Sequence, residues 1–224
     1  MIEVTYIDHM GSDISVVNAA RVSFGKKSEW MPRIHYGEQL VLKPKDAKLI
    51  KYLAKHKHKS PFNHTFVTFH VKAPIFVARQ LQKHEYMPWN EVSRRYVDDE
   101  PEFYQPDVWR GRSEDKKQGS DGVVDRSVGL GLNQQLEATH IAAIDMYDDL
   151  LNNGVCPEQA RMVLPQSMMT EWYWSGTLFA FAKMCSLRLK SDTQEETQLV
   201  AQKIALTMAK IYPVSWDALM EYAE

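Results

Sequence analysis

A predicted strand that leads directly into a predicted helix constrains the fold of this chain most strongly, and Pro74 and Pro88 mark the two ends of that helix. Residues 62–71, FNHTFVTFHV, are rich in the β-branched and aromatic residues that are typical of a strand. Pro74 suits the first turn of a helix, so PIFVARQLQKH predicts a helix from residue 74 to about 85, and Pro88 ends it. The first half of the chain therefore contains a strand that leads directly into a helix.

The rest of the chain also combines predicted strands with predicted helices. Residues 2–7 alternate apolar and polar side chains as a strand does, and TEWYWSGT at 170–177 predicts another strand. Capping signals and apolar residues at helical spacing predict helices that begin at Ser12 or Asp13 and helices over 43–56, 127–153, 157–165, 178–190, 193–212 and from 214 onward. The predicted fold class is α+β, helix-rich, with one domain over residues 1–224. Loops are expected at 25–43 and 97–126, with a flexible loop at 105–130.

Charge and cysteine content bear on possible partners. The formal net charge is −2, so no global positive field would hold the chain on nucleic acid, and any anion site must be local. Cys156 and Cys185 form no CxxC motif, which fits buried thiols in a reducing cytoplasm. No apolar run approaches the ~20 residues of a membrane span. We expect a soluble, cytoplasmic protein with neither a membrane nor a nucleic-acid partner.

The segment KHEYMPWNEVSRRY at 83–96 gathers charged and aromatic side chains around the end of the predicted helix. Gln80, Lys83 and His84 stand at positions i, i+3 and i+4 of that helix, where their polar ends can meet one ligand. A phosphate would suit the groups in the loop that follows, which are the hydroxyl of Ser93 and the guanidinium groups of Arg94 and Arg95. The alternative from chemistry alone is a solvated turn with internal ion pairs.

Histidines are concentrated between residues 56 and 70. Their spacing matches no zinc pattern, and they straddle a predicted helix end and a predicted strand, so no metal site is predicted. Lysine and histidine at the end of the helix at 43–56 are favoured by the helix dipole, which accounts for HKHK without a ligand.

Five sequence segments carry a family signature. They are HKSPFNHTFVTFHVKAPIFVARQ at 58–80, NEVSRRY at 90–96, EFY at 102–104, ARMVLP at 160–165 and LRLKSD at 187–192. In this order and spacing they resemble the flavin-dependent thymidylate synthases, whose signature is Arg-His-Arg and then Ser-x-Asn-Glu-x-Ser-x-Arg-Tyr. The chain keeps His84, Asn90, Glu91, Ser93, Arg95 and Tyr96. The resemblance implies a small, mainly antiparallel sheet and a homotetramer with active sites shared between subunits.

The resemblance also implies a nucleotide site and a flavin site. The positions that match the family's dUMP ligands are Gln80, Lys83, Glu91, Val92, Ser93, Arg94, Arg95, Arg161 and Arg188. The positions implied to line the FAD site are His58, Ser60, Lys83, His84, Glu85, Glu91, Thr177, Leu178, Phe179 and Lys183. Arg188 is the implied catalytic residue, because a fixed cation near N3 and O4 of uracil stabilises negative charge that develops on the ring.

The implied reaction is methylation of dUMP to dTMP. Methylenetetrahydrofolate supplies the carbon, reduced FAD supplies the hydride, and NADPH reduces the flavin again. The family uses no enzyme nucleophile. Neither cysteine of this chain has a histidine beside it in sequence, which agrees with that feature.

Several positions depart from the family pattern. Arg-His-Arg becomes Lys-His-Glu at 83–85, and Glu85 removes positive charge from beside a reduced flavin, which is anionic. Pro88 replaces a serine, Arg94 replaces a residue that is often glycine, Lys183 stands at a common asparagine and Asp192 at a common histidine. These departures leave open a related reaction, such as C5 hydroxymethylation or action on dCMP with the same carbon donor. The alternative from another class is a non-catalytic nucleotide- or nucleic-acid-binding module that has lost the flavin.

Overall fold

A four-stranded antiparallel sheet forms the centre of the computed structural model, which describes residues 1–32, 40–97, 99–114 and 119–222. The strand order is β1-β4-β8-β5, with bounds Glu3–Met10, Phe66–Pro74, Met169–Thr177 and Trp89–Glu91. The pairing of β4 with β8 runs from Phe66 opposite Thr177 to Pro74 opposite Met169. The prediction of an α+β fold with a small antiparallel sheet is confirmed.

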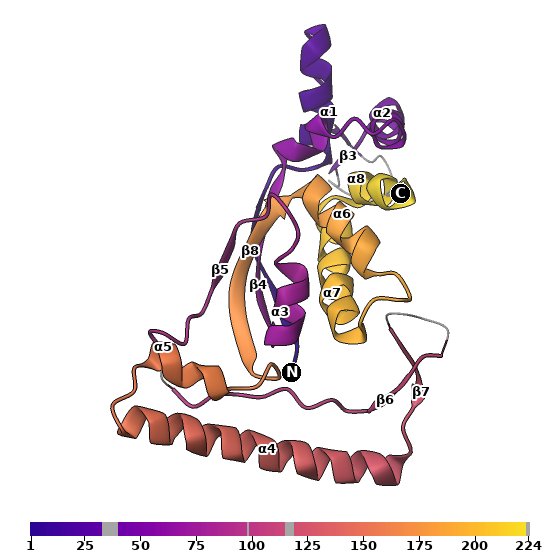
Figure 1. Ribbon diagram of the computed structural model, residues 1–224. Helices are drawn as coiled ribbons and strands as arrows, with labels where there is room; N and C mark the ends of the chain where they lie inside the picture. The colour runs from indigo at the N-terminus through magenta and orange to yellow at the C-terminus, as the bar shows by residue number, and fades with distance from the viewer. Residues whose placement is uncertain (33–39, 98, 115–118, 223–224) are drawn as a thin grey trace.

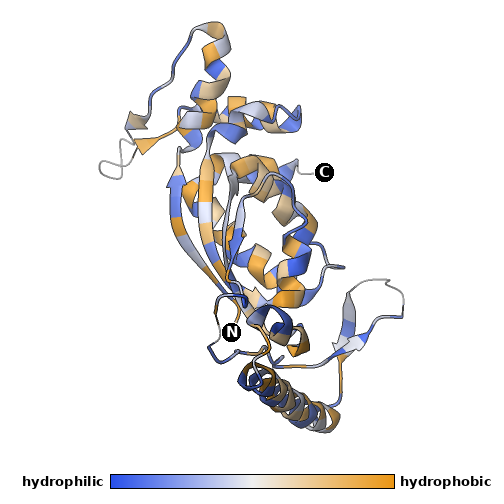
Figure 2. Cartoon of the chain, turned by 60° about the vertical axis from the view of Figure 1, so that its left-hand side comes forward, coloured by the Kyte–Doolittle hydropathy of each residue, from blue (hydrophilic) through white to orange (hydrophobic). Residues whose placement is uncertain are grey.

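The two faces of the sheet differ in polarity. Along β4, Val67, Phe69 and Val71 are buried on one face, whereas the residues between them are only partly buried. The second face carries polar cross-strand contacts, among them a 3.1 Å contact between His70 Nε2 and Glu171 Oε2. Figure 2 shows the resulting alternation of hydrophobic and hydrophilic residues along the strands. One face packs into the core and the other meets solvent, as is common in antiparallel sheets.

Three helices cover the apolar face, namely α3 (Ile75–Leu81), α6 (Leu178–Arg188) and α7 (Glu195–Ile211) (Figure 1). The helix α3 follows β4 without a loop, and α6 follows β8 in the same way, with Thr177 Oγ1 accepting a hydrogen bond of 3.2 Å from the backbone N–H of Ala180. Because β4 and β8 are antiparallel, the two helices begin at opposite ends of the sheet and run back along it. Their carboxyl ends therefore approach each other over the same face.

The remaining elements lie at the two ends of the molecule (Figure 1). One end holds the helices α1 (Asp13–Arg21), α2 (Pro44–Lys55) and α8 (Pro213–Glu221), the 3-10 helices η1 (Val22–Phe24) and η2 (Ser60–His64), and the short strands β2 (Met31–Pro32) and β3 (Leu40–Val41). The other end holds α4 (Arg126–Asn152), α5 (Pro157–Ala160) and η3 (Arg161–Val163). The strands β6 (Arg110–Arg112) and β7 (Ser120–Val123) form a two-stranded arm before α4. Within the described ranges, no helix combines the length and the hydropathy that a bilayer crossing requires.

Several predictions of secondary structure need correction. The loop predicted at 25–43 contains β2 and β3, and the helix predicted at 157–165 is α5 followed by η3. The helix predicted to reach residue 85 ends at Leu81, where the backbone N–H of His84 closes a tight turn on the carbonyl of Leu81 at 3.1 Å, and Tyr86 has a left-handed φ of 60°. The strand predicted from residue 62 begins at Phe66, because η2 occupies the preceding residues. The predicted loop at 97–126 contains β6 and β7, and α4 starts at Arg126, so the range 105–130 is partly regular structure. Residues 115–118 lie outside the described residues, and the flexibility of this range stays a prediction.

Candidate active site

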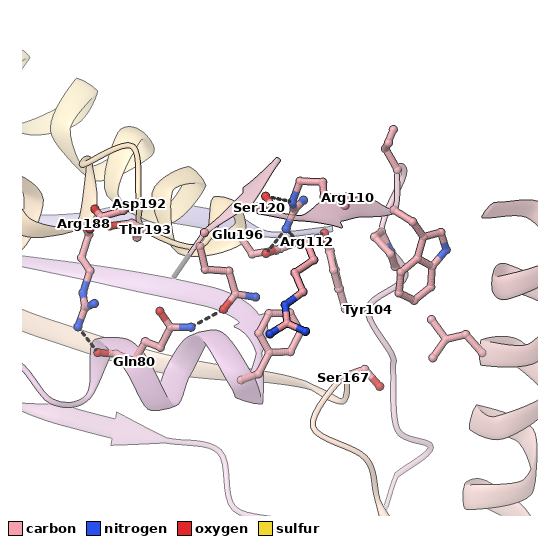
Figure 3. Close-up of a pocket in the computed structure, with 18 of the residues that line it drawn as sticks. Gln80, Tyr104, Arg110, Arg112, Ser120, Ser167, Arg188, Asp192, Thr193 and Glu196 are labelled. Atoms are coloured by element: carbon pink, nitrogen blue, oxygen red, sulfur yellow. Dashed lines mark hydrogen bonds and ion pairs between the residues drawn. The ribbon is translucent and has the colours of Figure 1, made fainter. Parts of the chain in front are cut away.

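Most of the predicted ligand positions line three clefts. The first, which we call the Gln80 cleft, has a volume of about 830 Å³ and lies between α3, the β6–β7 arm and the start of α7. Figure 3 shows Arg188 and Gln80 on one side of this cleft and Tyr104, Arg110 and Arg112 on the other. Its lining also includes Lys83, Trp109, Ser167, Asp192, Gln194 and Glu196.

The second cleft, the Phe179 cleft, measures about 770 Å³ and lies between the residues that follow α3 and the start of α6. Lys83 and Arg188 line this cleft as well as the first, so the two clefts adjoin. Most of the predicted flavin positions line it, namely Lys83, His84, Glu85, Thr177, Phe179 and Lys183. The Nζ of Lys59 stands 5.4 Å from the centre of the Phe179 ring, which gives the cleft an aromatic wall beside a cation.

The third cleft, the Arg161 cleft, measures about 460 Å³. It contains four of the predicted nucleotide positions, Glu91, Val92, Arg94 and Arg161. Glu91 is held there by the hydroxyl of Thr170, which donates to Oε1 at 2.7 Å, and by Trp89 Nε1, which donates to Oε2 at 3.0 Å. Arg94 pairs with Asp99 at 3.6 Å, and Arg161 Nε donates to the carbonyl of Glu158 at 3.3 Å.

The helix α3 separates the first cleft from the third. Phe76 and Gln80, one turn apart, line the Gln80 cleft, whereas Ile75 and Arg79, also one turn apart, line the Arg161 cleft. Residues at i and i+4 share one side of a helix, so the two pairs look out on different sides. Within one chain, the predicted nucleotide ligands therefore form two groups rather than one pocket.

Arg188 stands where the carboxyl ends of α3 and α6 meet. Its Nε donates to Nε2 of His84 at 3.0 Å, and its terminal NH2 donates to the backbone carbonyl of Gln80 at 2.9 Å. That carbonyl belongs to the last turn of α3, where acceptors lack a partner in the helix and the dipole favours a cation. No ion pair to a carboxylate neutralises Arg188 within the described part of the chain.

His84 is kept neutral so that it can accept from Arg188. Burial lowers its pKa from 6.5 to about 4, and the neighbouring charges of Arg188 and Lys183 act in the same direction. Nε2 of a neutral imidazole is an acceptor when the proton resides on Nδ1. Burial also lowers the pKa of Arg188 below its ordinary value, but a guanidinium stays protonated at neutral pH.

A polar network across the Gln80 cleft was not found from the sequence. The guanidinium of Arg110 donates to both carboxylate oxygens of Glu196 at 2.7 and 2.8 Å, and the hydroxyl of Tyr104 donates to the same carboxylate at 3.3 Å. The side chain of Glu196 is only 4% exposed. This ion pair fixes the β6–β7 arm against α7, and the only sequence signal for it is Trp109, Arg110 and Arg112 in an otherwise Gly- and Asp-rich stretch.

Five predicted ligand positions lie outside the described linings of these clefts. His58 and Ser60 are exposed, although Lys59 and Asn63 from the same segment line the Phe179 cleft. Leu178 is fully buried in the core, so a ligand would reach only its backbone. The hydroxyl of Ser93 accepts from the backbone N–H and from Nε of Arg95 at 3.4 Å each, and both residues lie next to Arg94 at the edge of the Arg161 cleft.

The cysteines differ from each other. Cys185 is buried, as predicted, and burial raises its pKa well above the ordinary range, which keeps the thiol protonated. Cys156, predicted to be buried, is exposed; it is the N-cap residue of the short helix α5, whose first residues are not buried either. The described residues contain no group of three or more histidine, cysteine or acidic side chains that are placed to hold a metal ion.

Comparisons with known proteins place the chain in one family. Residues 5–214 match the family model described as thymidylate synthase complementing protein. A flavin-dependent thymidylate synthase of Thermus thermophilus is 39% identical over 219 residues, which cover 98% of this chain and 76% of the relative. The enzyme of the same name from Thermosipho africanus is 37% identical, covering 97% and 90%.

Solved structures extend the likeness to the fold. The crystal structure of a UMP/dUMP methylase, PolB, from Streptomyces cacaoi bound with 5-Br dUMP is 30% identical, with a TM-score of 0.83 and coverage of 100% of this chain and 96% of that one. The same methylase bound with 5-Br UMP gives a TM-score of 0.85, with coverage of 100% and 95%.

Proposed function

The chain belongs to the flavin-dependent thymidylate synthase family and is an enzyme, and from that premise we propose that it methylates C5 of dUMP to give dTMP. In this proposal, methylenetetrahydrofolate is the carbon donor, FAD the cofactor and NADPH the reductant. The observation that carries the proposal is the position of Arg188, which lines both the Gln80 cleft and the Phe179 cleft. A nucleotide in one and a flavin in the other would meet at this guanidinium.

The Phe179 cleft has the groups that FAD requires. Lys59, Lys83 and Lys183 supply positive charge for a diphosphate. The side chains of Phe179 and Leu187 supply apolar surface for a flat ring. When bound and reduced, the flavin supplies the hydride of the reaction. The chain's own residues bind and orient it, and Glu85 is the one acidic side chain among the lining residues.

Arg188 is the proposed catalytic residue. Its Nε and one NH2 group are held by His84 and by the carbonyl of Gln80, which leaves the other N–H groups for a ligand. Because the acceptors that hold it are neutral, the positive charge remains available to stabilise an anionic uracil ring. A charge fixed in advance needs no reorganisation during the reaction, which is the main source of such stabilisation.

The proposed chemistry uses no cysteine nucleophile. Cys185 is a protonated thiol in the core, and Cys156 lies outside the described linings of the three clefts. A thiolate would have to be generated by a nearby base or cation, and burial of Cys185 acts in the opposite direction. Both thiols are unpaired, which is consistent with the reducing cytoplasm that we propose as the location.

We also propose that the enzyme is a homotetramer whose nucleotide sites are completed between subunits. The support is that Gln80, Lys83 and Arg188 lie on one side of α3, and Glu91, Arg94 and Arg161 on the other. Apolar residues on α4 would supply the contact area: Val128, Leu130, Ile141 and Met146 are each about half exposed, at 53%, 59%, 54% and 48%. Closed symmetric assemblies of identical chains are the usual outcome of such surfaces.

A related reaction is the second candidate. Two departures from the family pattern, Glu85 and Asp192, line the Phe179 cleft and the Gln80 cleft respectively, where they would face the ligands. The solved methylase that this chain resembles is named for both UMP and dUMP. The sugar, the base and the product are therefore the variables to test.

The experiment incubates the purified enzyme with FAD, NADPH, methylenetetrahydrofolate and one of dUMP, UMP or dCMP, and determines the product by mass spectrometry. The expected product is dTMP from dUMP. A hydroxymethyl product, heavier than the methyl product by one oxygen, or turnover of dCMP alone would favour the second candidate. A protein that gains no flavin absorbance on incubation with FAD and turns over none of the three nucleotides would contradict the proposal.

A further inference from the structure

The side-chain amide of Gln80 is bonded at both of its ends. Its Nε2 donates to Oε1 of Gln194, and its Oε1 accepts from the hydroxyl of Thr197 at 3.2 Å. Thr197 is fully buried in the first turns of α7, and Gln194 is the residue that precedes this helix. Two residues more than 110 positions away in the sequence thus hold an amide that lines the Gln80 cleft.

Gln194 is itself oriented by Glu196. The carboxylate of Glu196 is buried, which alone would raise its pKa, but the hydrogen bonds and charge of Arg110 and a hydrogen bond from Gln194 hold the pKa below its ordinary value. An ionised carboxylate only accepts hydrogen bonds. A carboxylate beside Gln194 therefore favours the orientation that its contact with Gln80 shows, in which the oxygen of Gln194 faces Gln80.

These contacts determine which way the side-chain amide of Gln80 points. The oxygen and the NH2 group of an amide are nearly equal in size, so packing alone does not decide which way the amide of Gln80 points. The oxygen that Gln194 presents does decide it, because the reversed amide would face oxygen with oxygen. The hydroxyl of Thr197, which can donate or accept, anchors the other end of the amide. The Nε2 of Gln80 then keeps its second N–H for a ligand in the cleft.

We propose that Glu196, Gln194 and Thr197 are positioning residues that fix the amide of Gln80 with its N–H donor toward the nucleotide. This inference rests on the proposed function, in which Gln80 is a nucleotide ligand. The group that the donor would meet is an acceptor oxygen, on the phosphate or on the uracil. A donor set in advance contributes to binding of the nucleotide rather than to the chemical step, so its loss raises KM for dUMP and leaves kcat nearly unchanged.

The test compares two threonines of the same helix. Thr197→Val removes the hydroxyl that faces Gln80 with almost no change in volume, and Thr207→Val makes the same change where the hydroxyl bonds only the carbonyl of Lys203. The expected result is an increase in KM for dUMP of about tenfold for Thr197→Val, the loss of one buried hydrogen-bond partner, with kcat within about twofold. Thr197→Ser, which restores the hydroxyl, and Thr207→Val should match the wild type. Gln194→Ala, on a half-buried residue before the helix, should raise KM in the same way and provides a second measurement if Thr197→Val folds poorly.

A double-mutant cycle with Gln80→Ala separates positioning from general destabilisation. If Thr197 acts through Gln80, Thr197→Val has no further effect on KM once Gln80 is alanine. Additive effects, or an unchanged KM in both Thr197→Val and Gln194→Ala, would overturn the inference while dUMP turnover by the wild type leaves the proposed function standing. A wild-type enzyme that neither binds nor turns over dUMP would overturn both.

Discussion

The Gln80 cleft and the Arg161 cleft hold the two groups of proposed nucleotide ligands, and they are built in different ways. In the Gln80 cleft, side chains far apart in sequence hold one another: Arg188 bonds the carbonyl of Gln80, and Arg110 bonds Glu196 at 2.7 Å. In the Arg161 cleft, the two arginines that are predicted ligands interact within a few residues of themselves, Arg94 with Asp99 and Arg161 with Glu158.

The difference indicates what each cleft contributes to the proposed reaction. The long-range contacts of the Gln80 cleft set its polar groups in place before a ligand arrives, and such preorganisation is what a catalytic charge requires. The local contacts of the Arg161 cleft leave Arg161 itself exposed and able to turn toward a ligand outside its own chain. We therefore expect removal of the fixed charge of Arg188 to affect the chemical step, and substitutions of Gln80 or of the Arg161 cleft to affect mainly nucleotide binding.

The largest effect is expected for Arg188→Ala. Loss of the fixed cation beside the ring should lower kcat about 10²- to 10³-fold or abolish turnover, while FAD affinity remains nearly unchanged. Steady-state kinetics and a fluorescence titration with FAD measure the two quantities, and Arg188→Lys, which keeps the charge without the planar fork, is the matched control. Normal turnover by Arg188→Ala would remove this residue from the chemistry.

Arg161→Ala should have the next largest effect, and mainly on binding. Removing a charged donor from a phosphate or uracil typically costs one to two factors of ten in affinity, so KM for dUMP should rise about 10- to 100-fold with a much smaller change in kcat. Kinetics at saturating dUMP separate the two parameters. A loss of kcat as large as that of Arg188→Ala, at unchanged KM, would contradict the assignment of Arg161 to nucleotide binding and of Arg188 to the chemical step.

Glu85→Arg should produce a smaller change, confined to the flavin. Glu85 lines the Phe179 cleft with Lys59 and Lys183, so reversing its charge adds attraction for the diphosphate and for an anionic reduced ring. FAD should bind about 3- to 10-fold more tightly, or its reduction potential should rise. Equilibrium titration and spectroelectrochemistry measure these values, and no change in either would show that the carboxylate of Glu85 faces solvent.

The last prediction concerns stability rather than activity, and it is the pH dependence that His84 confers. Its pKa of about 4 in the folded enzyme lies below the ordinary 6.5, so the unfolded chain takes up this proton first as the pH falls. The free energy of unfolding of the wild type should therefore decrease relative to His84→Gln between about pH 6.5 and pH 4 and then level off. Urea denaturation at several pH values measures the difference, and parallel curves for the two proteins would contradict a neutral, buried His84.

Local patterns in the sequence predicted most of the fold. Pro74, Pro157 and Gly154 mark element ends that the structure confirms, because proline and glycine act on the backbone at their own position. The end of α3 at Leu81 was missed, because the turn through His84 and the left-handed Tyr86 leave no mark in the hydrophobic periodicity.

The candidate site was harder to predict from such local patterns than the fold. The segments 83–96 and 187–192 pointed to Lys83, His84 and Arg188, and the structure brings these three together. The partnership of Arg110 with Glu196 spans 86 residues and depends on how the β6–β7 arm meets α7, so no local pattern encodes it. The division of the nucleotide ligands by α3 likewise follows from the packing of this helix on the sheet, which a residue list does not contain.

Subunit complementation tests most directly whether the Gln80 cleft of one subunit and the Arg161 cleft of another form one site. Arg188→Ala and Arg161→Ala chains, each with a different affinity tag, are produced together, and the mixed oligomers are purified and assayed at low dUMP. With random assembly, about a quarter of the sites receive an intact Arg188 from one chain and an intact Arg161 from another, so we predict about a quarter of wild-type activity. Mixed oligomers as inactive as the two parents would contradict a shared site.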